Sequence, residues 1–172
     1  MKIIFSHGME SGPWGSKINR LADIAASRKL ELESVDYTDC KDPDFRVERL
    51  RSVLDEQSGD CLLAGSSMGG YVSLLAAQTH PVKGLFLMAP AVHMPGYSSQ
   101  ADSTQSPVVD IVHGWNDEVI PAEHAIRFAR EWGHALHLVN GNHALSDVLE
   151  DVDRLFSLFL DRVLGQTKQR CV

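Results

Sequence analysis

The chain has 172 residues, enough for one domain of ordinary size, and 44% of them are hydrophobic, as in globular proteins. Its formal net charge of −7 argues against a nucleic acid or an anionic membrane surface as a partner. Three cysteines without Cys-x-x-Cys spacing indicate reduced thiols, and Met1–Phe5 does not resemble the start of a signal peptide. We therefore expect a cytoplasmic protein without a membrane span.

Hydrophobic periodicity predicts strands that alternate with helices along the chain. The predicted strands are Ile3–Phe5, Leu30–Val35, Cys61–Ala64, Val82–Met88, Val108–His113 and Ala135–Val139. The predicted helices are 16–28, 42–58, 71–79, 121–132 and 145–163, and the basic segment Arg46–Arg51 is expected to be a solvated helix face.

This alternation predicts the fold class. Strands that alternate with helices pair in parallel, and the helices cover both faces of the sheet. We therefore expect a three-layer α/β/α sandwich with a six-stranded parallel sheet. A single domain over 1–165 would precede a polar tail over 166–172.

The third predicted strand runs into Gly65-Ser66-Ser67-Met68-Gly69, and a helix follows. Gly-x-Ser-x-Gly in this context is typical of a nucleophile elbow, a tight turn that exposes a serine hydroxyl. The turn requires strained dihedral angles at Ser67, and crowding two residues to either side favours Gly65 and Gly69. The helix starts with free N–H groups that favour negative charge beside Ser67. The plain alternative is that Ser67 only caps its helix.

Three further polar segments follow predicted strands, at His7-Gly8, Asp117 and His143. The carboxyl ends of parallel strands lie at one edge of a sheet, where ligands bind. A serine hydroxyl needs a base within hydrogen-bond reach, and a histidine oriented by a carboxylate is the usual base. The sequence thus predicts that Ser67, His143 and Asp117 act together.

Other residues compete for two of these roles. Glu118 and Asp110 are rival carboxylates for the position of Asp117. His113 ends a strand beside the acid loop, and we expect it to pack rather than to act chemically.

The chain order Ser67, Asp117, His143 resembles that of the α/β-hydrolase superfamily. Gly114-x-x-Asp117-x-x-Ile120-Pro121 resembles the acid loop of these proteins, and Gly141-Asn142-His143 resembles their histidine loop. The resemblance extends over residues 2–163 and is greatest to small single-domain bacterial serine esterases and thioesterases. It implies a serine hydrolase that acts on a small-molecule ester or thioester without a cofactor.

The resemblance also implies an oxyanion loop after the first strand, at Gly8. The backbone N–H groups of Met9 and Met68 would then form the oxyanion hole. The lid insertion usual in this superfamily is reduced here to 89–106, so we expect a lidless fold, an open crevice and short or accessible acyl groups.

Three residues in or near the predicted site could line its pocket. Trp14 and Trp115 lie in loops of the predicted site, and His93 lies in the loop after Met88. Ordinary packing or solvation is the alternative for each of them.

Other classes of site lack sequence support. No His-x-x-x-His spacing or Asp/His cluster indicates a metal, and the glycines fit neither a dinucleotide fingerprint nor a phosphate loop. The alternative function from another class is an interaction protein that retains the hydrolase fold with little or no turnover. The sequence leaves the oligomeric state open.

Overall fold

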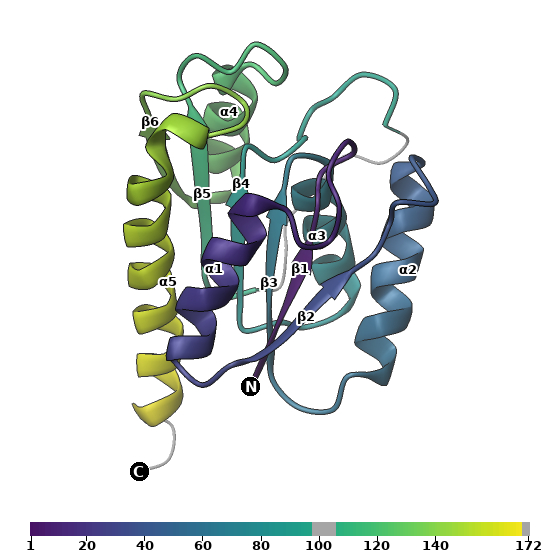
Figure 1. Ribbon diagram of the computed structural model, residues 1–172, viewed down its shortest axis with the longest axis vertical. Helices are drawn as coiled ribbons and strands as arrows, with labels where there is room; N and C mark the ends of the chain where they lie inside the picture. The colour runs from purple at the N-terminus through teal and green to yellow at the C-terminus, as the bar shows by residue number, and fades with distance from the viewer. Residues whose placement is uncertain (98–105, 170–172) are drawn as a thin grey trace.

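In the computed structural model, six parallel strands form one sheet (Figure 1). The structure describes residues 1–97 and 106–169, without the side chains of 166–169. The strands are β1 (Lys2–Ser6), β2 (Glu31–Val35), β3 (Cys61–Ser66), β4 (Gly84–Met88), β5 (Val109–Gly114) and β6 (Ala135–Val139). The helices are α1 (Ser16–Ser27), α2 (Pro43–Glu56), α3 (Met68–Thr79), α4 (Ala122–Trp132) and α5 (Leu149–Gln169), and a 3₁₀ turn, η1 (Ser146–Val148), precedes α5. This order confirms the predicted alternation.

The strand order is β2-β1-β3-β4-β5-β6, so the direction in which the chain adds strands reverses at β1. In open parallel sheets, ligands bind outside the carboxyl ends of the strands at such a reversal. His7 follows β1 and Ser67 follows β3, and these two strands are hydrogen-bonded neighbours. The topology therefore brings two of the predicted loops together.

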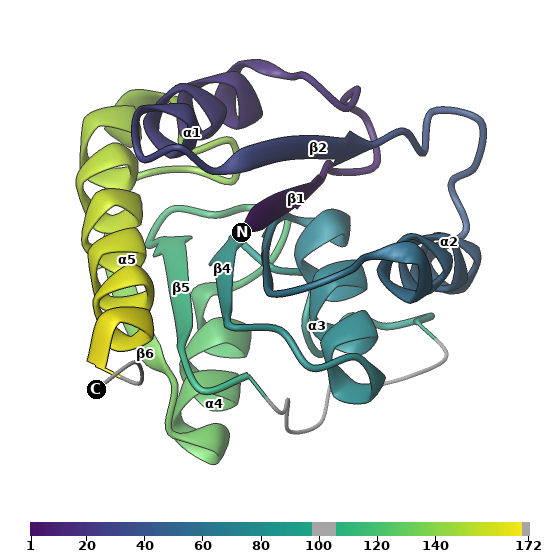
Figure 2. The same ribbon diagram turned by 90° about the horizontal axis from the view of Figure 1, so that it is seen from below.

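Helices cover both faces of the sheet (Figure 2). α2, α3 and α4 pack on one face, where Leu85 and Leu87 of β4 point, and α1 and α5 pack on the other. On that second face, the ring of Phe86 lies 5.0 Å from Phe156 and 5.5 Å from Phe159, between centroids. Successive side chains of a strand point to opposite faces, so each internal strand contributes to both hydrophobic layers. The predicted three-layer sandwich is confirmed.

The closing helix differs from its prediction at both ends. Leu145 has a positive φ of 56°, and η1 intervenes before α5 begins at Leu149. The backbone N–H of Leu145 donates to the carbonyl and side-chain oxygens of Asn142, which keeps this stretch in a turn. α5 continues to Gln169 and thus enters the predicted tail, because glutamine and lysine are good helix formers. Residues 170–172 of that tail lie outside the described residues. None of the described helices combines the length and the apolar character that a membrane span needs.

Candidate active site

Ser67 lies in a strained turn between β3 and α3. Its φ of 54° and ψ of −120° are unfavourable for a residue with a side chain. A Cβ on Gly65 would collide with the backbone of Gly69, and a Cβ on Gly69 would collide with the carbonyl of Ser6. The two glycines therefore allow β1, β3 and α3 to approach closely enough to form the turn. This is the local geometry that the sequence predicted.

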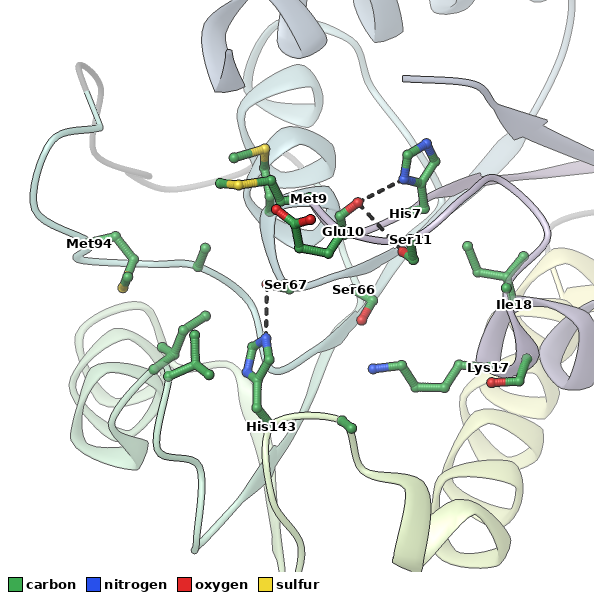
Figure 3. Close-up of a pocket in the computed structure, with 18 of the residues that line it drawn as sticks. His7, Met9, Glu10, Ser11, Lys17, Ile18, Ser66, Ser67, Met94 and His143 are labelled. Carbon is green, nitrogen blue, oxygen red and sulfur yellow. Dashed lines mark hydrogen bonds between the residues drawn. The ribbon is translucent and has the colours of Figure 1, made fainter. Parts of the chain in front are cut away.

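The structure brings Ser67, His143 and Asp117 together, and Figure 3 shows the contact between Ser67 and His143. Oγ of Ser67 lies 3.0 Å from Nε2 of His143, and Nδ1 of His143 lies 2.8 Å from Oδ2 of Asp117. Nδ1–H donates to the carboxylate, which leaves Nε2 free to accept the serine proton. Turns after β3, β5 and β6 supply the three side chains.

The Asp117 side chain is fully buried, yet its carboxylate has donors on both oxygens. Oδ1 accepts the backbone N–H groups of Val119 at 2.9 Å and Ile120 at 2.8 Å. Oδ2 faces His143 and also lies 3.2 Å from Nε2 of His113. A buried carboxylate is stable only when donors replace its lost hydration, and this loop supplies them.

The two rival carboxylates lie elsewhere. Asp110 is buried at the opposite end of β5, where it pairs with Arg162 and lies 3.4 Å from His137. Glu118 is exposed to solvent. Asp117 is therefore the carboxylate that faces His143.

A hydrogen-bond cluster fixes the orientation of the Gly8 carbonyl. Nε2 of His7 accepts the backbone N–H of Tyr37 at 3.0 Å, so Nδ1 carries the proton and donates to the Gly8 carbonyl at 2.7 Å. The Nη1 group of Arg46 donates to the same carbonyl at 3.3 Å. Carbonyl and N–H point in opposite directions across a trans peptide, so the N–H of Met9 points away from this cluster.

The two basic groups of this cluster are buried. His7 is fully buried, and burial lowers the pKa of its imidazole, which keeps it neutral at pH 7. Arg46 is 1% exposed, and burial lowers the pKa of its guanidinium. Its donors are directed to the carbonyls of Gly8, Tyr37 and Cys40.

Comparisons with known proteins show the family to which this fold belongs. Residues 57–167 match the family model for the alpha/beta hydrolase fold, and residues 2–103 match the model of an uncharacterised protein family, UPF0227. A crystal structure from Xanthomonas campestris pv. campestris, named as a hydrolase of the alpha/beta superfamily, is 32% identical to this chain. That match covers 94% of this chain and 99% of the other, with a TM-score of 0.87. The chain belongs to the α/β-hydrolase superfamily.

More distant structures share the fold of this α/β hydrolase. Est1E from Butyrivibrio proteoclasticus is 18% identical over 95% of this chain and 88% of its own, with a TM-score of 0.82. An alpha-beta serine hydrolase homologue from Coxiella burnetii is 24% identical over 91% of this chain and 82% of its own, with a TM-score of 0.71. No curated protein gives a significant match.

A cavity of about 510 Å³ opens beside Ser67 and His143 in this α/β hydrolase. Its lining includes Met9 of the first loop and Lys17 of α1. Its apolar wall includes Met68, Ala91, Met94, Tyr97, Val119 and Ile120. Part of the 89–106 segment therefore borders the cavity, and residues 98–105 lie outside the described residues. Among the part of the chain that the structure describes, no three histidine, cysteine, aspartate or glutamate side chains form a metal-binding group.

None of the three predicted pocket residues lines this cavity. The Trp14 ring is half-exposed and packs near Phe5, at 6.5 Å between ring centroids. Trp115 is 56% exposed. His93 has a positive φ of 55°, and its ring packs 6.2 Å from Phe128 of α4. The expectation that Trp14, Trp115 and His93 form pocket walls is therefore not met.

The structure adds residues that the sequence analysis missed. Arg46 was expected on a solvated helix face, but it shares a buried face of α2 with Leu50 and Leu54. The spacing of four residues from Arg46 to Leu50 and from Leu50 to Leu54 is the signal that could have identified it. His113 is buried, as expected, and donates to the carbonyl of Ile120 at 2.9 Å, but its contact with Asp117 was not foreseen.

Proposed function

We propose that this α/β hydrolase is a serine hydrolase that cleaves carboxylic esters or thioesters through an acyl-enzyme on Ser67. The observation that carries the proposal is the 3.0 Å contact between Oγ of Ser67 and His143, whose other ring nitrogen faces a buried carboxylate. A serine hydroxyl is a poor nucleophile unless a base accepts its proton, and His143 is placed to be that base.

In the first half of the proposed reaction, Oγ of Ser67 attacks the acyl carbonyl carbon while Nε2 of His143 takes the hydroxyl proton. The Asp117 carboxylate holds the histidine tautomer and stabilises the imidazolium that forms. Negative charge develops on the carbonyl oxygen. Met68 is the first residue of α3, so its backbone N–H has no intrahelical acceptor. This N–H is therefore available to bind that oxygen. The orientation of the Gly8 carbonyl supports the N–H of Met9 as the second donor.

Collapse of the tetrahedral intermediate breaks the bond from carbon to the leaving oxygen or sulfur, and His143 transfers its proton to that atom. Water then enters and loses a proton to His143 as it attacks the acyl carbon. The acid leaves, and Ser67 regains the proton. The chain's own residues perform each of these steps, and no cofactor takes part.

Labelling with a fluorophosphonate probe tests the nucleophile. We expect the wild-type protein to be labelled at Ser67 and the Ser67→Ala variant to lose labelling while its circular dichroism spectrum is unchanged. Ser73→Ala is the matched control, since Ser73 is a buried serine further along α3, and this variant should be labelled. Labelling of the Ser67→Ala variant would refute the assignment.

A panel of acyl esters and acyl thioesters with graded chain lengths then tests turnover. We expect hydrolysis of at least one class, lost in the Ser67→Ala variant. A protein that is labelled at Ser67 but turns over no member of the panel would instead favour the interaction protein that retains a hydrolase fold.

A further inference from the structure

Lys17 places a positive charge in the cavity beside the proposed nucleophile. It is the second residue of α1, and its side chain is half-buried in the cavity lining. Figure 3 shows its ammonium group reaching from α1 toward His143, on the side of the pocket opposite Met94. The charge therefore lies where part of a bound substrate would lie.

The residues that the structure describes supply no ionic partner for this ammonium group. Lys2, Lys41 and Lys83 each lie within 3.3 Å of a carboxylate oxygen, at Glu33, Glu10 and Asp60 respectively. Within 4.0 Å of the Lys17 nitrogen, by contrast, the described residues place no carboxylate. Among the described lining residues, Glu10 is the other charged side chain, and it pairs with Lys41.

The cavity also disfavours an isolated charge. Burial lowers the pKa of Lys17 because the ammonium loses hydration, although the Asp117 carboxylate acts in the opposite direction. A partly desolvated ammonium is stabilised when an anion approaches it. The side of the cavity opposite Lys17, by contrast, is apolar at Met94. The cavity thus combines one apolar side and one cationic side, with Ser67 between them.

We propose that Lys17 binds a carboxylate group carried by the ester or thioester that Ser67 attacks. The substrate would then be an acidic ester, with the carboxylate in either the acyl part or the leaving group and an apolar part on the Met94 side. This inference rests on the proposed function, since it concerns the substrate of the same site.

Two matched pairs of esters test the inference. The first pair is p-nitrophenyl hexanoate and the mono-p-nitrophenyl ester of adipic acid, which adds a carboxylate to an acyl chain of equal length. The second pair is 4-(butyryloxy)benzoate and its methyl ester, which places the carboxylate in the leaving group. The readout is the ratio of kcat/KM for the acidic ester to that for the neutral ester, measured for each variant.

In one of the two pairs, we expect Lys17→Met to lower this ratio about 10- to 100-fold, the effect of one hydrogen bond to a charged group. Lys17→Arg should retain most of the ratio because it keeps the charge. Lys83→Met is the matched control, since it removes the same charge at the amino end of β4, the opposite edge of the sheet. Its ratio should equal that of the wild type.

Two outcomes separate this inference from the proposed function. If the esters are hydrolysed and Lys17→Met leaves both ratios unchanged, the carboxylate site is wrong and the serine hydrolase stands. If no ester is hydrolysed and Ser67 is not labelled by a fluorophosphonate, both proposals are wrong.

A third case is labelling of Ser67 without turnover. Adipate should then slow labelling more than 1,6-hexanediol does, and only when Lys17 is present. Equal protection by the two compounds would overturn the inference.

Discussion

Nε2 of His113 lies 3.2 Å from Oδ2 of Asp117, the oxygen that also accepts Nδ1–H of His143. Burial lowers the pKa of His113, so its imidazole is neutral at pH 7, and its proton lies on Nε2, which donates to the Ile120 carbonyl at 2.9 Å. His113 therefore holds the backbone of the acid loop through the Ile120 carbonyl, with the same N–H close to the Asp117 carboxylate. We regard it as a positioning residue.

Replacing His113 by phenylalanine keeps an aromatic ring and removes this N–H. We expect kcat to fall about fivefold, since a net contribution of about 1 kcal/mol corresponds to roughly that change in rate. His134→Phe is the control, because His134 is another histidine that packs against a phenylalanine, at 5.4 Å from Phe128. Wild-type kcat in the His113 variant would show that the contact with Asp117 is only structural.

Asp117→Asn tests the carboxylate itself. We expect kcat to fall by about 10³- to 10⁴-fold, because an amide does not hold the histidine tautomer or stabilise the imidazolium. Steady-state hydrolysis of the best ester of the panel provides the measurement. Glu118→Gln serves as the control, as that neighbouring carboxylate is exposed, and its kcat should be unchanged. The reverse result would transfer the role of the acid to Glu118.

Arg46 holds the Gly8 carbonyl, and its loss should disturb the loop that carries Met9. For Arg46→Met we expect kcat to fall about 10- to 100-fold, somewhat less than the loss of an oxyanion donor costs. The rate of fluorophosphonate labelling should fall in parallel. Arg49→Met removes an equal charge from the same helix, but its ion pair with Asp39 is at the surface and contributes little. Equal effects of the two substitutions would argue against the role of Arg46 in this loop.

The strain at Ser67 predicts a gain in stability when its side chain is removed. Glycine adopts a φ of 54° without steric cost, whereas alanine keeps the Cβ. We expect the free energy of unfolding of Ser67→Gly to exceed that of Ser67→Ala by about 1 kcal/mol. Equilibrium urea unfolding of the two inactive variants measures this difference. If the alanine variant is as stable as the glycine variant, the turn is not strained at this residue.

Four buried or half-buried histidines with lowered pKa values predict that acid destabilises the fold. Burial lowers the pKa of His7, His93, His113 and His134. Between these lowered values and the ordinary value of about 6.5, the unfolded chain binds more protons than the folded chain. The free energy of unfolding therefore has its full histidine contribution above about pH 6.5 and loses it as the pH falls below that value.

Urea unfolding at about pH 7.5 and about pH 5 tests this expectation. The urea midpoint should be lower at the acidic pH, and the difference should be smaller in His113→Phe, which lacks one of the four groups. Equal midpoints at the two pH values would mean that these histidines do not exchange protons on unfolding.

The sequence by itself determined the order of elements and the turn at Ser67. Apolar residues with a period of two or of three to four specify strands and helices locally, and alternation of the two favours a parallel sheet. Gly65 and Gly69 are the residues that the crowded backbone of the turn requires, so the elbow was predictable from five consecutive residues. The chain order Ser67, Asp117, His143 resembles that of the α/β-hydrolase superfamily, and this resemblance predicted that the three residues share one site.

The tertiary structure alone decided which side chains support that site. Arg46 reaches the Gly8 carbonyl across 38 residues of sequence, and Lys17 enters the cavity because α1 begins beside it. Trp14 and Trp115 lie in the expected loops but outside the cavity lining. The periodicity of apolar residues indicates only whether a residue faces the core. Contacts between distant loops depend instead on how the packed layers orient each turn. No local sequence pattern encodes that orientation.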